Sequence, residues 1–424
     1  MKTRSQTTSS TIEVTVEKVV YGGAGLARHE GKVVFLPFTA AGDRVKARVV
    51  EQKKNFIRAS VVEILEPGPG RQVPPCPHFG SCGGCQWQHL EYSRQLETKR
   101  AILEEIFHHR FPETRNLKID MKGCPEPFGY RSRARIQLRG FGQESRVGFF
   151  QFHAHEVEDV ESCPLFRPLL NTALKSIRET RRSAASDPGV QQMELACTSE
   201  DEAWAAANLH TAGDPTTGFE TGSGGEEILL RRRAGEFTYW VSPATFFQAN
   251  DFLLEELVET VSDLSKDTGT GAALDLFSGV GLFTLPLARQ FQRVLAIEES
   301  TLASRLCARN ALVAGLANVE VICAEASAWM PAGASDQVFD LIVLDPPRAG
   351  ASSKLFERLI QWGAPTIIYV ACDPQTLARD LALLAPRFYG IDFVRGFDLF
   401  PQTYHFETVV RLKAVVGGAR EVGS

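Results

Sequence analysis

The sequence predicts an α/β protein of three parts: a small N-terminal β-barrel, a central α+β segment and a C-terminal doubly wound sheet. Short Val- and Ile-rich segments without helical periodicity precede Pro67-Gly68-Pro69-Gly70, a pattern typical of a barrel followed by a boundary. After residue 240, short apolar runs alternate with helix-like segments, which is typical of parallel βαβ units. We therefore place the domains at residues 1–66, 67–240 and 241–424.

The N-terminal part is predicted to contain strands at residues 11–20, 32–38, 43–52 and 55–65. Residues 1–66 hold 11 Lys and Arg against 7 Asp and Glu, a net charge of +4, whereas the whole chain has a net charge of −5. A local excess of basic residues is expected where a protein binds nucleic acid. A solvated basic face would have the same composition.

The overall composition is that of an ordinary globular protein with room for more than one core. The chain has 424 residues, of which 44% are hydrophobic and 23% are charged. The first eight residues are polar, unlike a signal peptide, and no apolar run is long enough to span a bilayer. Nine cysteines, an odd number, argue against a fully disulfide-bonded secreted protein. We expect a cytoplasmic monomer without a membrane segment.

A cysteine-rich loop opens the central part. Cys76, Cys82 and Cys85 follow the spacing C-x5-C-x2-C, and two glycines between the last two cysteines allow the loop to fold tightly. Cys163 is the best candidate for a fourth ligand. Four thiolates can hold either a structural zinc ion or an iron–sulfur cluster. A disulfide framework is the weaker interpretation, because nothing indicates an oxidising compartment.

Downstream of this loop, we expect a helix over residues 90–107 and then an arginine-rich strand over residues 130–139. The two-residue period of a strand puts four arginines on one face: Arg131, Arg133, Arg135 and Arg139. Guanidinium groups this close repel one another unless anions bind between them, so the pattern favours contact with phosphates. An exposed edge strand is the alternative interpretation.

The C-terminal part is predicted to form a parallel sheet with strands at residues 272–277, 294–298, 319–323, 340–345, 366–372 and 391–397, and a last, antiparallel strand at 404–412. A glycine turn containing Gly279 and Gly281 follows the first of these strands. Thr284 stands where a nicotinamide-binding turn needs its third glycine. Asp275 before the turn and Glu298 at the end of the next strand fit S-adenosylmethionine better. A glycine turn with no ligand is the alternative.

Two other strands end on reactive residues at the edge where parallel sheets bind ligands. One ends at Asp345-Pro346-Pro347-Arg348 and the other at Cys372. Asp373 and Pro374 after the cysteine have the residue types of a helix N-cap and first turn. The N-terminus of a helix is expected to lower the pKa of the Cys372 thiol, which favours a nucleophile over an inert buried cysteine.

Several motifs resemble those of two known families. Residues 31–38 with 42–45 resemble a TRAM domain, which implies an OB-like RNA-binding barrel. The cysteine loop, Asp-Leu-Phe-Ser-Gly-Val-Gly-Leu-Phe-Thr, Asp-Pro-Pro-Arg, Ala-Cys-Asp-Pro-Gln-Thr and Phe-Pro-Gln-Thr-Tyr-His-Phe-Glu resemble the RNA 5-methyluridine methyltransferase family. They are most similar to its TRAM- and cluster-containing 23S rRNA branch. The resemblance implies a central iron–sulfur domain, followed along the chain by a Rossmann-like methyltransferase domain.

The same resemblance implies the roles of individual residues. It makes Cys372 the nucleophile and Glu407 the general base. It implies a [4Fe-4S] cluster on four cysteines: Cys76, Cys82, Cys85 and Cys163. It implies an S-adenosylmethionine site lined by Gln248, Phe277, Glu298 and Asp345, to which the glycine turn adds Gly279 and Gly281. The arginine-rich strand itself predicts RNA contacts from Arg131, Arg133 and Arg135. Leu282 and Ala324 depart from the family, because some rRNA members carry polar cofactor contacts there.

Apart from this resemblance, the chemistry of uracil methylation itself requires a thiolate and a base. Uracil C5 is a poor nucleophile, and attack of a thiolate at C6 makes it enolate-like; a base must later remove the C5 proton. Cytosine-C5 methylation is an alternative, but it typically uses a second cysteine near the Asp-Pro-Pro strand end, where this chain has none. Inactive RNA-binding factors and radical enzymes fit less well. The sequence leaves rRNA and tRNA both open as substrates.

Overall fold

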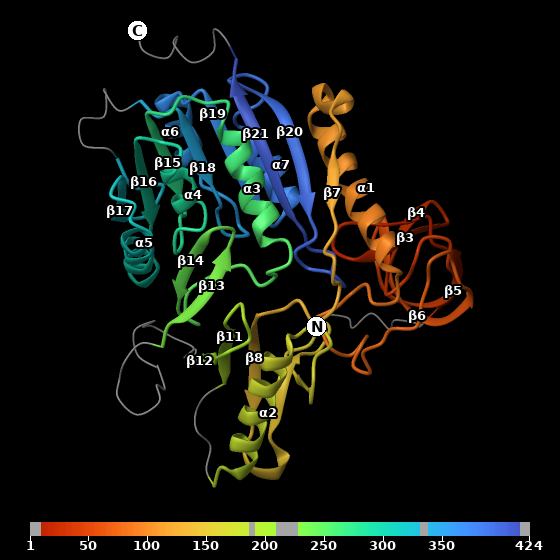
Figure 1. Ribbon diagram of the computed structural model, residues 1–424. Helices are drawn as coiled ribbons and strands as arrows, with labels where there is room; N and C mark the ends of the chain where they lie inside the picture. Colours follow the sequence, from red (N-terminus) through yellow and green to blue (C-terminus); the bar gives the residue numbers. More distant parts are fainter. Residues whose placement is uncertain (1–9, 186–190, 209–227, 331–337, 416–424) are drawn as a thin grey trace, which may run out of the picture.

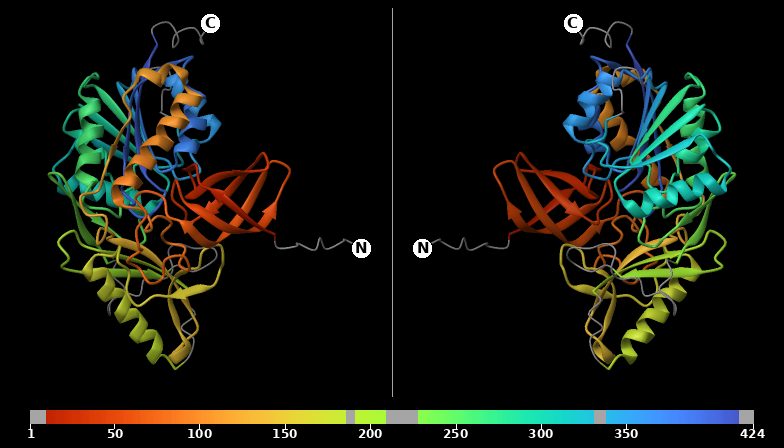
Figure 2. Two further views of the ribbon diagram at one scale, coloured as in Figure 1. Left: turned by 90° about the vertical axis from the view of Figure 1, so that its right-hand side faces the viewer. Right: turned by 90° about the vertical axis from the view of Figure 1, so that its left-hand side faces the viewer.

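The computed structural model describes residues 10–185, 191–208, 228–330 and 338–415. A small barrel lies beside a large mixed sheet, and a central sheet lies below both in Figure 1. Figure 2 shows that the barrel projects from the body formed by the other two parts. In the described part of the chain, no helix is both long and apolar enough to cross a bilayer.

The N-terminal barrel has six strands in the order β1-β5-β6-β4-β3-β2. Its strands are β1 (Thr11–Thr15), β2 (Lys18–Val19), β3 (Ala24–His29), β4 (Lys32–Pro37), β5 (Arg44–Gln52) and β6 (Phe56–Glu66). Strand β3 was not predicted, because its Gly25 belongs to a glycine-rich run that is typical of a turn. A Cβ atom at Gly25 would lie 2.1 Å from Oγ1 of Thr39, so close packing of the barrel requires this glycine.

The central sheet is antiparallel, with the strand order β10-β9-β8-β11-β12. Its strands are β8 (Arg133–Arg139), β9 (Arg146–Phe150), β10 (Val157–Asp159), β11 (Gln192–Cys197) and β12 (Trp204–Asn208). Helix α2 (Pro168–Ser183) covers one face, where Leu170 and Leu174 share a core with Ile136 and Leu195. The cysteine-rich loop precedes this sheet and forms neither helix nor long strand.

The C-terminal sheet has eight strands in the order β17-β16-β15-β18-β19-β21-β20-β7. Its strands are β7 (Asp120–Lys122), β15 (Ala272–Leu276), β16 (Arg293–Glu298), β17 (Val319–Cys323), β18 (Leu341–Leu344), β19 (Thr366–Ala371), β20 (Tyr389–Phe397) and β21 (Glu407–Ala414). Strands β15 to β19 pair in parallel, whereas β21 is antiparallel to both β19 and β20. The expected doubly wound sheet with a final antiparallel strand is confirmed.

Helices cover both faces of this sheet. One face carries α3 (Leu254–Ser265), α4 (Thr284–Ala288) and α5 (Thr301–Val313), and the other carries α1 (Tyr92–Arg110), α6 (Ser353–Trp362) and α7 (Pro374–Leu381). Alternation along β15 sends Ala273 to the first face and Leu274 to the second. The hairpin of β13 (Leu230–Ala234) and β14 (Phe237–Val241) packs on the first face, where the hydroxyl of Tyr239 donates to the carbonyl oxygen of Leu282 at 3.1 Å.

Part of the segment 67–240 is integral to the C-terminal sheet. Strand β7 pairs in parallel with β20 at the sheet edge, and α1 buries Leu103 and Phe107 in the core that also holds Leu377 of α7. This arrangement was not predicted, because β7 has only three residues. It places α1 beside β7 and β20 at this edge of the sheet (Figure 1).

Candidate active site

The pairing of β19 with β21 brings the two predicted catalytic residues to the same place. Ala371 pairs with Thr408, so the next residues toward that edge of the sheet, Cys372 and Glu407, stand opposite each other. This happens only because β21 is antiparallel: its first residue lies at the edge where the parallel strands end. A thiol and a carboxyl group thus meet at the carboxyl ends of the strands, where open α/β sheets bind ligands.

The chain around Cys372 folds as its sequence predicts, but its electrostatics differ. Asp373 is the N-cap of α7 and Pro374 is its first residue, as expected. The expectation of a lowered thiol pKa is wrong for the free chain: burial, followed by the charges of Glu407 and Asp345, raises the pKa of Cys372 to about 12. The nearby Arg348 acts in the opposite direction and lowers it. Burial of the thiol is the largest of these causes.

Three acidic side chains with raised pKa values lie along this edge of the sheet. Burial raises the pKa of Asp275 to about 7, and burial together with the charge of Asp275 raises that of Asp345 to about 7. Glu407 is only 2% exposed, and burial and Asp345 raise its pKa well above the usual range. Within the described residues, Oδ1 of Asp275 and Oε2 of Glu407 have no hydrogen-bond partner. Such a row of acids suits a ligand that brings positive charge.

The glycine turn after β15 forms a tight cradle. Phe277, Gly279 and Gly281 have φ angles of +62°, +55° and +97°, which is rare for a bulky residue such as Phe277. The N–H of Gly279 donates to Oε2 of Glu298 at 2.9 Å, and the N–H of Ser300 donates to Oε1 at 2.8 Å. The turn and the acid that ends β16 are therefore bonded into one unit. A Cβ at Gly281 would lie 3.0 Å from the sulfur of Cys307.

The two departures from the family lie close to this cradle. Leu282 is buried, with its side chain in the core of the α3–α5 face. The N–H of Ala324 donates to the carbonyl oxygen of Glu298 at 2.9 Å. Neither side chain offers a hydrogen bond, so contacts at these positions are limited to the backbone and to apolar surface.

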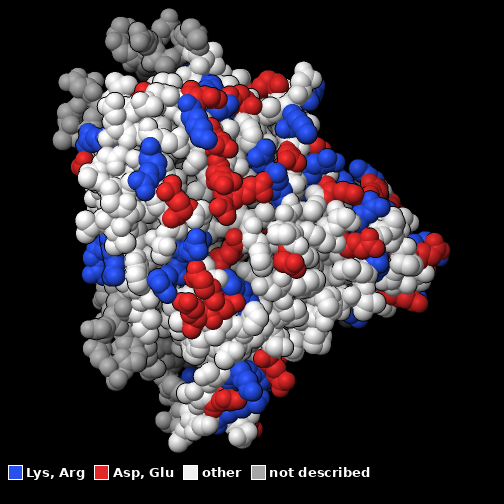
Figure 3. All heavy atoms as spheres, in the orientation of Figure 1, with Lys and Arg blue, Asp and Glu red and all other residues white. Residues whose placement is uncertain are grey.

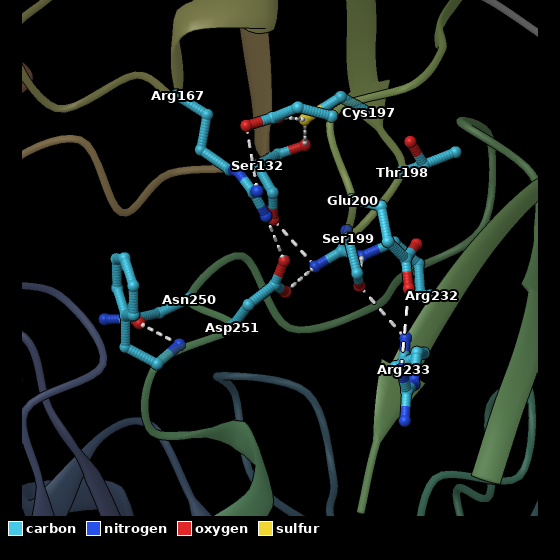
Figure 4. A network of polar contacts seen from close by, with 12 residues as sticks. Ser132, Arg167, Cys197, Thr198, Ser199, Glu200, Arg232, Arg233, Asn250 and Asp251 are labelled. Atoms are coloured by element: carbon cyan, nitrogen blue, oxygen red, sulfur yellow. Dashed lines mark hydrogen bonds and ion pairs between the residues drawn. The ribbon is translucent and has the colours of Figure 1, made fainter.

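Gln248 lies in a loop that a network of buried charges holds in place. Figure 4 shows Asp251 between Arg167 and Arg232, which both donate to its carboxylate. Arg232 is 1% exposed and also donates to the carbonyl oxygen of Gln248 at 3.2 Å. The side-chain Oε1 of Gln248 is buried and, among the described residues, has no partner. The loop is rigidly anchored and leaves one acceptor free for a ligand.

The three predicted RNA-binding arginines have different surroundings. Arg133 is largely buried: it donates to the carbonyl oxygens of Pro243 and Thr245 in the Gln248 loop and pairs with Glu194. Arg135 also pairs with Glu194, at 2.6 Å, but 58% of its side chain is exposed. Glu194 on β11 thus relieves the repulsion that we had assigned to bound anions. Arg131 lies beside the cysteine loop, where its charge lowers the pKa of the Cys85 thiol.

The four predicted cluster ligands line a single cavity of about 410 Å³. All nine cysteines of the chain are free thiols. Burial and the charges of neighbouring thiols raise the pKa of Cys82 to about 11 and that of Cys85 to about 12, and burial also raises the pKa of Cys163. No group of three or more His, Cys, Asp and Glu side chains in the described ranges is placed to hold a metal ion. Arg131 also lines this cavity.

The same cavity contains Cys372, together with Arg348 and His405, which the sequence did not single out as site residues. Burial lowers the pKa of His405 to about 4. Arg348 directly follows the Asp-Pro-Pro strand end, and this position was the only signal for it in the sequence.

A second groove, of about 930 Å³, runs between the barrel and the central sheet and includes Arg58, Arg135 and Tyr404. On the face shown in Figure 3, acidic and basic side chains are interspersed.

Comparison with known proteins identifies this arrangement. A family model described as tRNA (Uracil-5-)-methyltransferase matches residues 226–415, and a TRAM domain model matches residues 6–62. The 23S rRNA (uracil(1939)-C(5))-methyltransferase RlmD of Halomonas elongata is 32% identical, covering 97% of this chain and 91% of that protein. The chain belongs to the RNA uracil-5-methyltransferase family.

Two further relatives agree with this membership. An RNA methyltransferase of Aquifex aeolicus is 32% identical and covers 95% of this chain and 98% of that protein. The structure of the Pyrococcus abyssi tRNA (uracil-54, C5)-methyltransferase with S-adenosyl-L-homocysteine has a TM-score of 0.72 and 25% identity, covering 94% of this chain and all of that one. This uracil-5-methyltransferase therefore has the family's TRAM and catalytic folds, and it uses S-adenosylmethionine.

Proposed function

We propose that this enzyme methylates C5 of a uridine in 23S rRNA through a covalent bond between the sulfur of Cys372 and C6 of the base. The observation that carries the proposal is the register of β19 and β21, which sets Cys372 opposite Glu407. The rRNA assignment is supported by relatives from Halomonas elongata and Klebsiella pneumoniae that are named for 23S rRNA and 32% identical over nearly the whole chain.

The two residues act at different steps. The Cys372 thiolate adds to C6, and the electron pair of the C5–C6 bond moves toward C5 and the C4 carbonyl. S-adenosylmethionine supplies the electrophilic methyl group that bonds to C5. Glu407 then accepts the C5 proton, and the electron pair left behind reforms the double bond and expels the sulfur of Cys372. Burial and Asp345 raise the pKa of Glu407 in the free chain, and a cationic cofactor nearby would favour the carboxylate form that accepts the proton.

The chain's own residues also account for the state of the thiol. In the free chain, burial and two carboxyl groups raise the pKa of Cys372 above its ordinary value and so disfavour the thiolate. Arg348 provides the neighbouring positive charge that favours the thiolate. A cationic ligand beside Asp345 and Glu407 would lower all three pKa values, so activation of the nucleophile would accompany binding of the S-adenosylmethionine sulfonium.

The residues at the carboxyl edge fit S-adenosylmethionine. Glu298 is oriented by two backbone N–H groups, Gln248 offers an unpartnered oxygen, and Asp345 offers a negative charge. Phe277, Gly279 and Gly281 would form the wall of the site through their unusual backbone angles. These features support the six residues as the cofactor site.

Four cysteines, Cys76, Cys82, Cys85 and Cys163, would hold the [4Fe-4S] cluster. The cluster would supply no bond-making step and would fix the loop that forms the wall beside Cys372.

Arg131 and Arg135 are the proposed RNA contacts, because they line the cavities and Arg135 is exposed. The contacts of Arg133 support a role in holding the Gln248 loop instead.

The same reaction on tRNA is the second candidate, favoured by the likeness to the Pyrococcus abyssi tRNA (uracil-54, C5)-methyltransferase. Mapping of 5-methyluridine by mass spectrometry in cells with and without the gene separates the two. We expect one 23S rRNA uridine to lose its methyl group in the deletion strain and regain it with the wild-type gene but not with Cys372→Ala. Loss of 5-methyluridine from tRNA alone, or loss of 5-methylcytidine, would overturn the assignment.

A further inference from the structure

The tip of the N-terminal barrel touches the residue that follows the proposed nucleophile. Tyr21 lies in the turn between β2 and β3, and its hydroxyl donates to Oδ2 of Asp373 at 2.8 Å. These two residues are 352 positions apart in the sequence. The barrel is therefore bonded directly to the active-site loop.

Asp373 receives contacts from two sides. Its Oδ1 accepts the N–H groups of Gln375 at 3.1 Å and Thr376 at 2.9 Å, which caps α7. Its Oδ2 accepts the bond from Tyr21 and lies 3.6 Å from Nε of Arg348. Only 12% of the Asp373 side chain is exposed. The helix fixes one oxygen and the barrel fixes the other, so the backbone next to Cys372 is held from both directions.

The turn that carries Tyr21 is itself locked in place. Nε1 of the buried Trp87, two residues after Cys85, donates to the carbonyl oxygen of Gly23 at 3.2 Å. A Cβ atom at Gly23 would lie 3.0 Å from the ring of Tyr404. The ring of Tyr21 meets that of Tyr404 edge-on, with 5.5 Å between centroids. The turn is wedged between the cysteine loop and the segment that precedes Glu407.

Tyr21 and Tyr404 also line the groove of about 930 Å³ between the barrel and the central sheet. A chain bound at this end of the groove would lie against the side chain that holds Asp373. The barrel is thus in a position to affect the chemical step as well as the affinity for RNA.

We propose that Tyr21 is a positioning residue for Cys372, acting through Asp373. The hydroxyl holds the carboxylate and its backbone so that the sulfur is presented to C6 of the base. This inference rests on the proposed function, because it takes Cys372 as the nucleophile.

The test compares Tyr21→Phe with the wild-type enzyme in single turnover at saturating RNA. This substitution removes the hydroxyl and keeps the ring packed on Tyr404. We expect formation of the covalent complex to slow by about tenfold, the effect of losing a hydrogen bond to a charged group. The dissociation constants for RNA and S-adenosylmethionine should change less than about twofold, because the ring and its contact with Tyr404 are kept. Tyr389→Phe is the matched control. Tyr389 is the first residue of β20, and its hydroxyl donates to the carbonyl oxygen of Ala364, just before β19 and at the opposite end of that strand from Cys372. This variant should keep the wild-type rate.

A second measurement separates positioning from partial unfolding. In a Glu407→Gln background, Tyr21→Phe should trap the same final amount of covalent complex, but more slowly. A lower amplitude with an unchanged rate, or a weaker RNA affinity with a wild-type rate, would overturn the inference. Failure of Glu407→Gln to trap any complex with Tyr21 intact would count against the proposed function instead.

Discussion

Lys99 and Asp398 form an ion pair that is completely buried, with Nζ 2.6 Å from Oδ1 and both side chains 0% exposed. Nζ of Lys99 also donates to the carbonyl oxygens of Phe400 at 3.2 Å and His405 at 2.9 Å. One helix side chain thus holds both ends of the loop that leads into Glu407. This contact ties α1 to the loop between β20 and β21, in addition to the apolar packing of α1 on the sheet.

Removing one partner of this pair should be costly. Lys99→Met leaves an uncompensated carboxylate in the interior, and we expect the free energy of unfolding to fall by about 3–5 kcal/mol. Chemical denaturation followed by circular dichroism measures this. Lys99→Met combined with Asp398→Asn should recover part of the loss, because the buried charge is then absent as well. A loss below about 1 kcal/mol for the single variant would show that the pair does not anchor the loop.

Two arginines on the same strand should have separable effects. Arg135→Ala removes an exposed cation from the groove, so RNA affinity should fall and its dependence on salt should become shallower by about one unit of slope. Arg133→Ala removes a clamp on the Gln248 loop, so binding of S-adenosylmethionine should weaken more than the RNA salt slope changes. Salt titrations and calorimetry on the two variants measure these effects. An RNA salt slope that changes equally in both would contradict the distinction.

The cysteine cavity predicts the metal content. Protein purified without oxygen should be brown and should contain about four iron atoms per chain, as expected for a cluster bound by four thiolates. Cys85→Ser should lose iron and destabilise the middle of the chain, whereas Cys323→Ser, which changes an exposed cysteine outside the cavity, should retain it. Stoichiometric zinc without iron would refute the cluster.

The raised pKa of Asp275 predicts a pH dependence of stability. Its folded pKa of about 7 is above the usual value of 3.8, so its contribution to stability is fully present below the lower value and is lost as the pH rises to about 7. Asp275→Asn removes this term, so the melting temperature of the wild type relative to the variant should fall between pH 4 and pH 7. The comparison cancels the opposite contribution of His89 and His405, whose pKa values are lowered to about 4. A constant difference would show that Asp275 is not buried in the free protein.

The sequence predicts the fold well where strands are long and apolar. The strands expected at residues 340–345 and 366–372 are β18 and β19 almost without shift, because parallel strands buried on both faces are continuous apolar runs. Strand β7 escapes prediction because three residues carry no periodicity. Strand β3 was not predicted because Gly25, which close packing requires, belongs to a glycine-rich run that is typical of a turn.

In the candidate site, too, local features could be predicted from the sequence and long-range contacts could not. Asp373 could be predicted as an N-cap from its own sequence context, because capping is a local interaction. The raised pKa of Cys372 could not, since it depends on Glu407 and Asp345, which come from other strands. The role of Arg133 also required the fold: Glu194, Pro243 and Thr245 surround it only after the central sheet has formed.

The most direct test of the covalent mechanism compares Glu407→Gln with Cys372→Ala on a denaturing gel after incubation with RNA and S-adenosylmethionine. Glu407→Gln keeps the shape of the side chain but cannot accept the C5 proton, so methylated RNA should remain bonded to Cys372. We predict a slowly migrating protein–RNA band for Glu407→Gln, and neither band nor methylation for Cys372→Ala. Near-normal turnover of Glu407→Gln without a band would assign the base elsewhere, and residual methylation by Cys372→Ala would contradict the covalent mechanism itself.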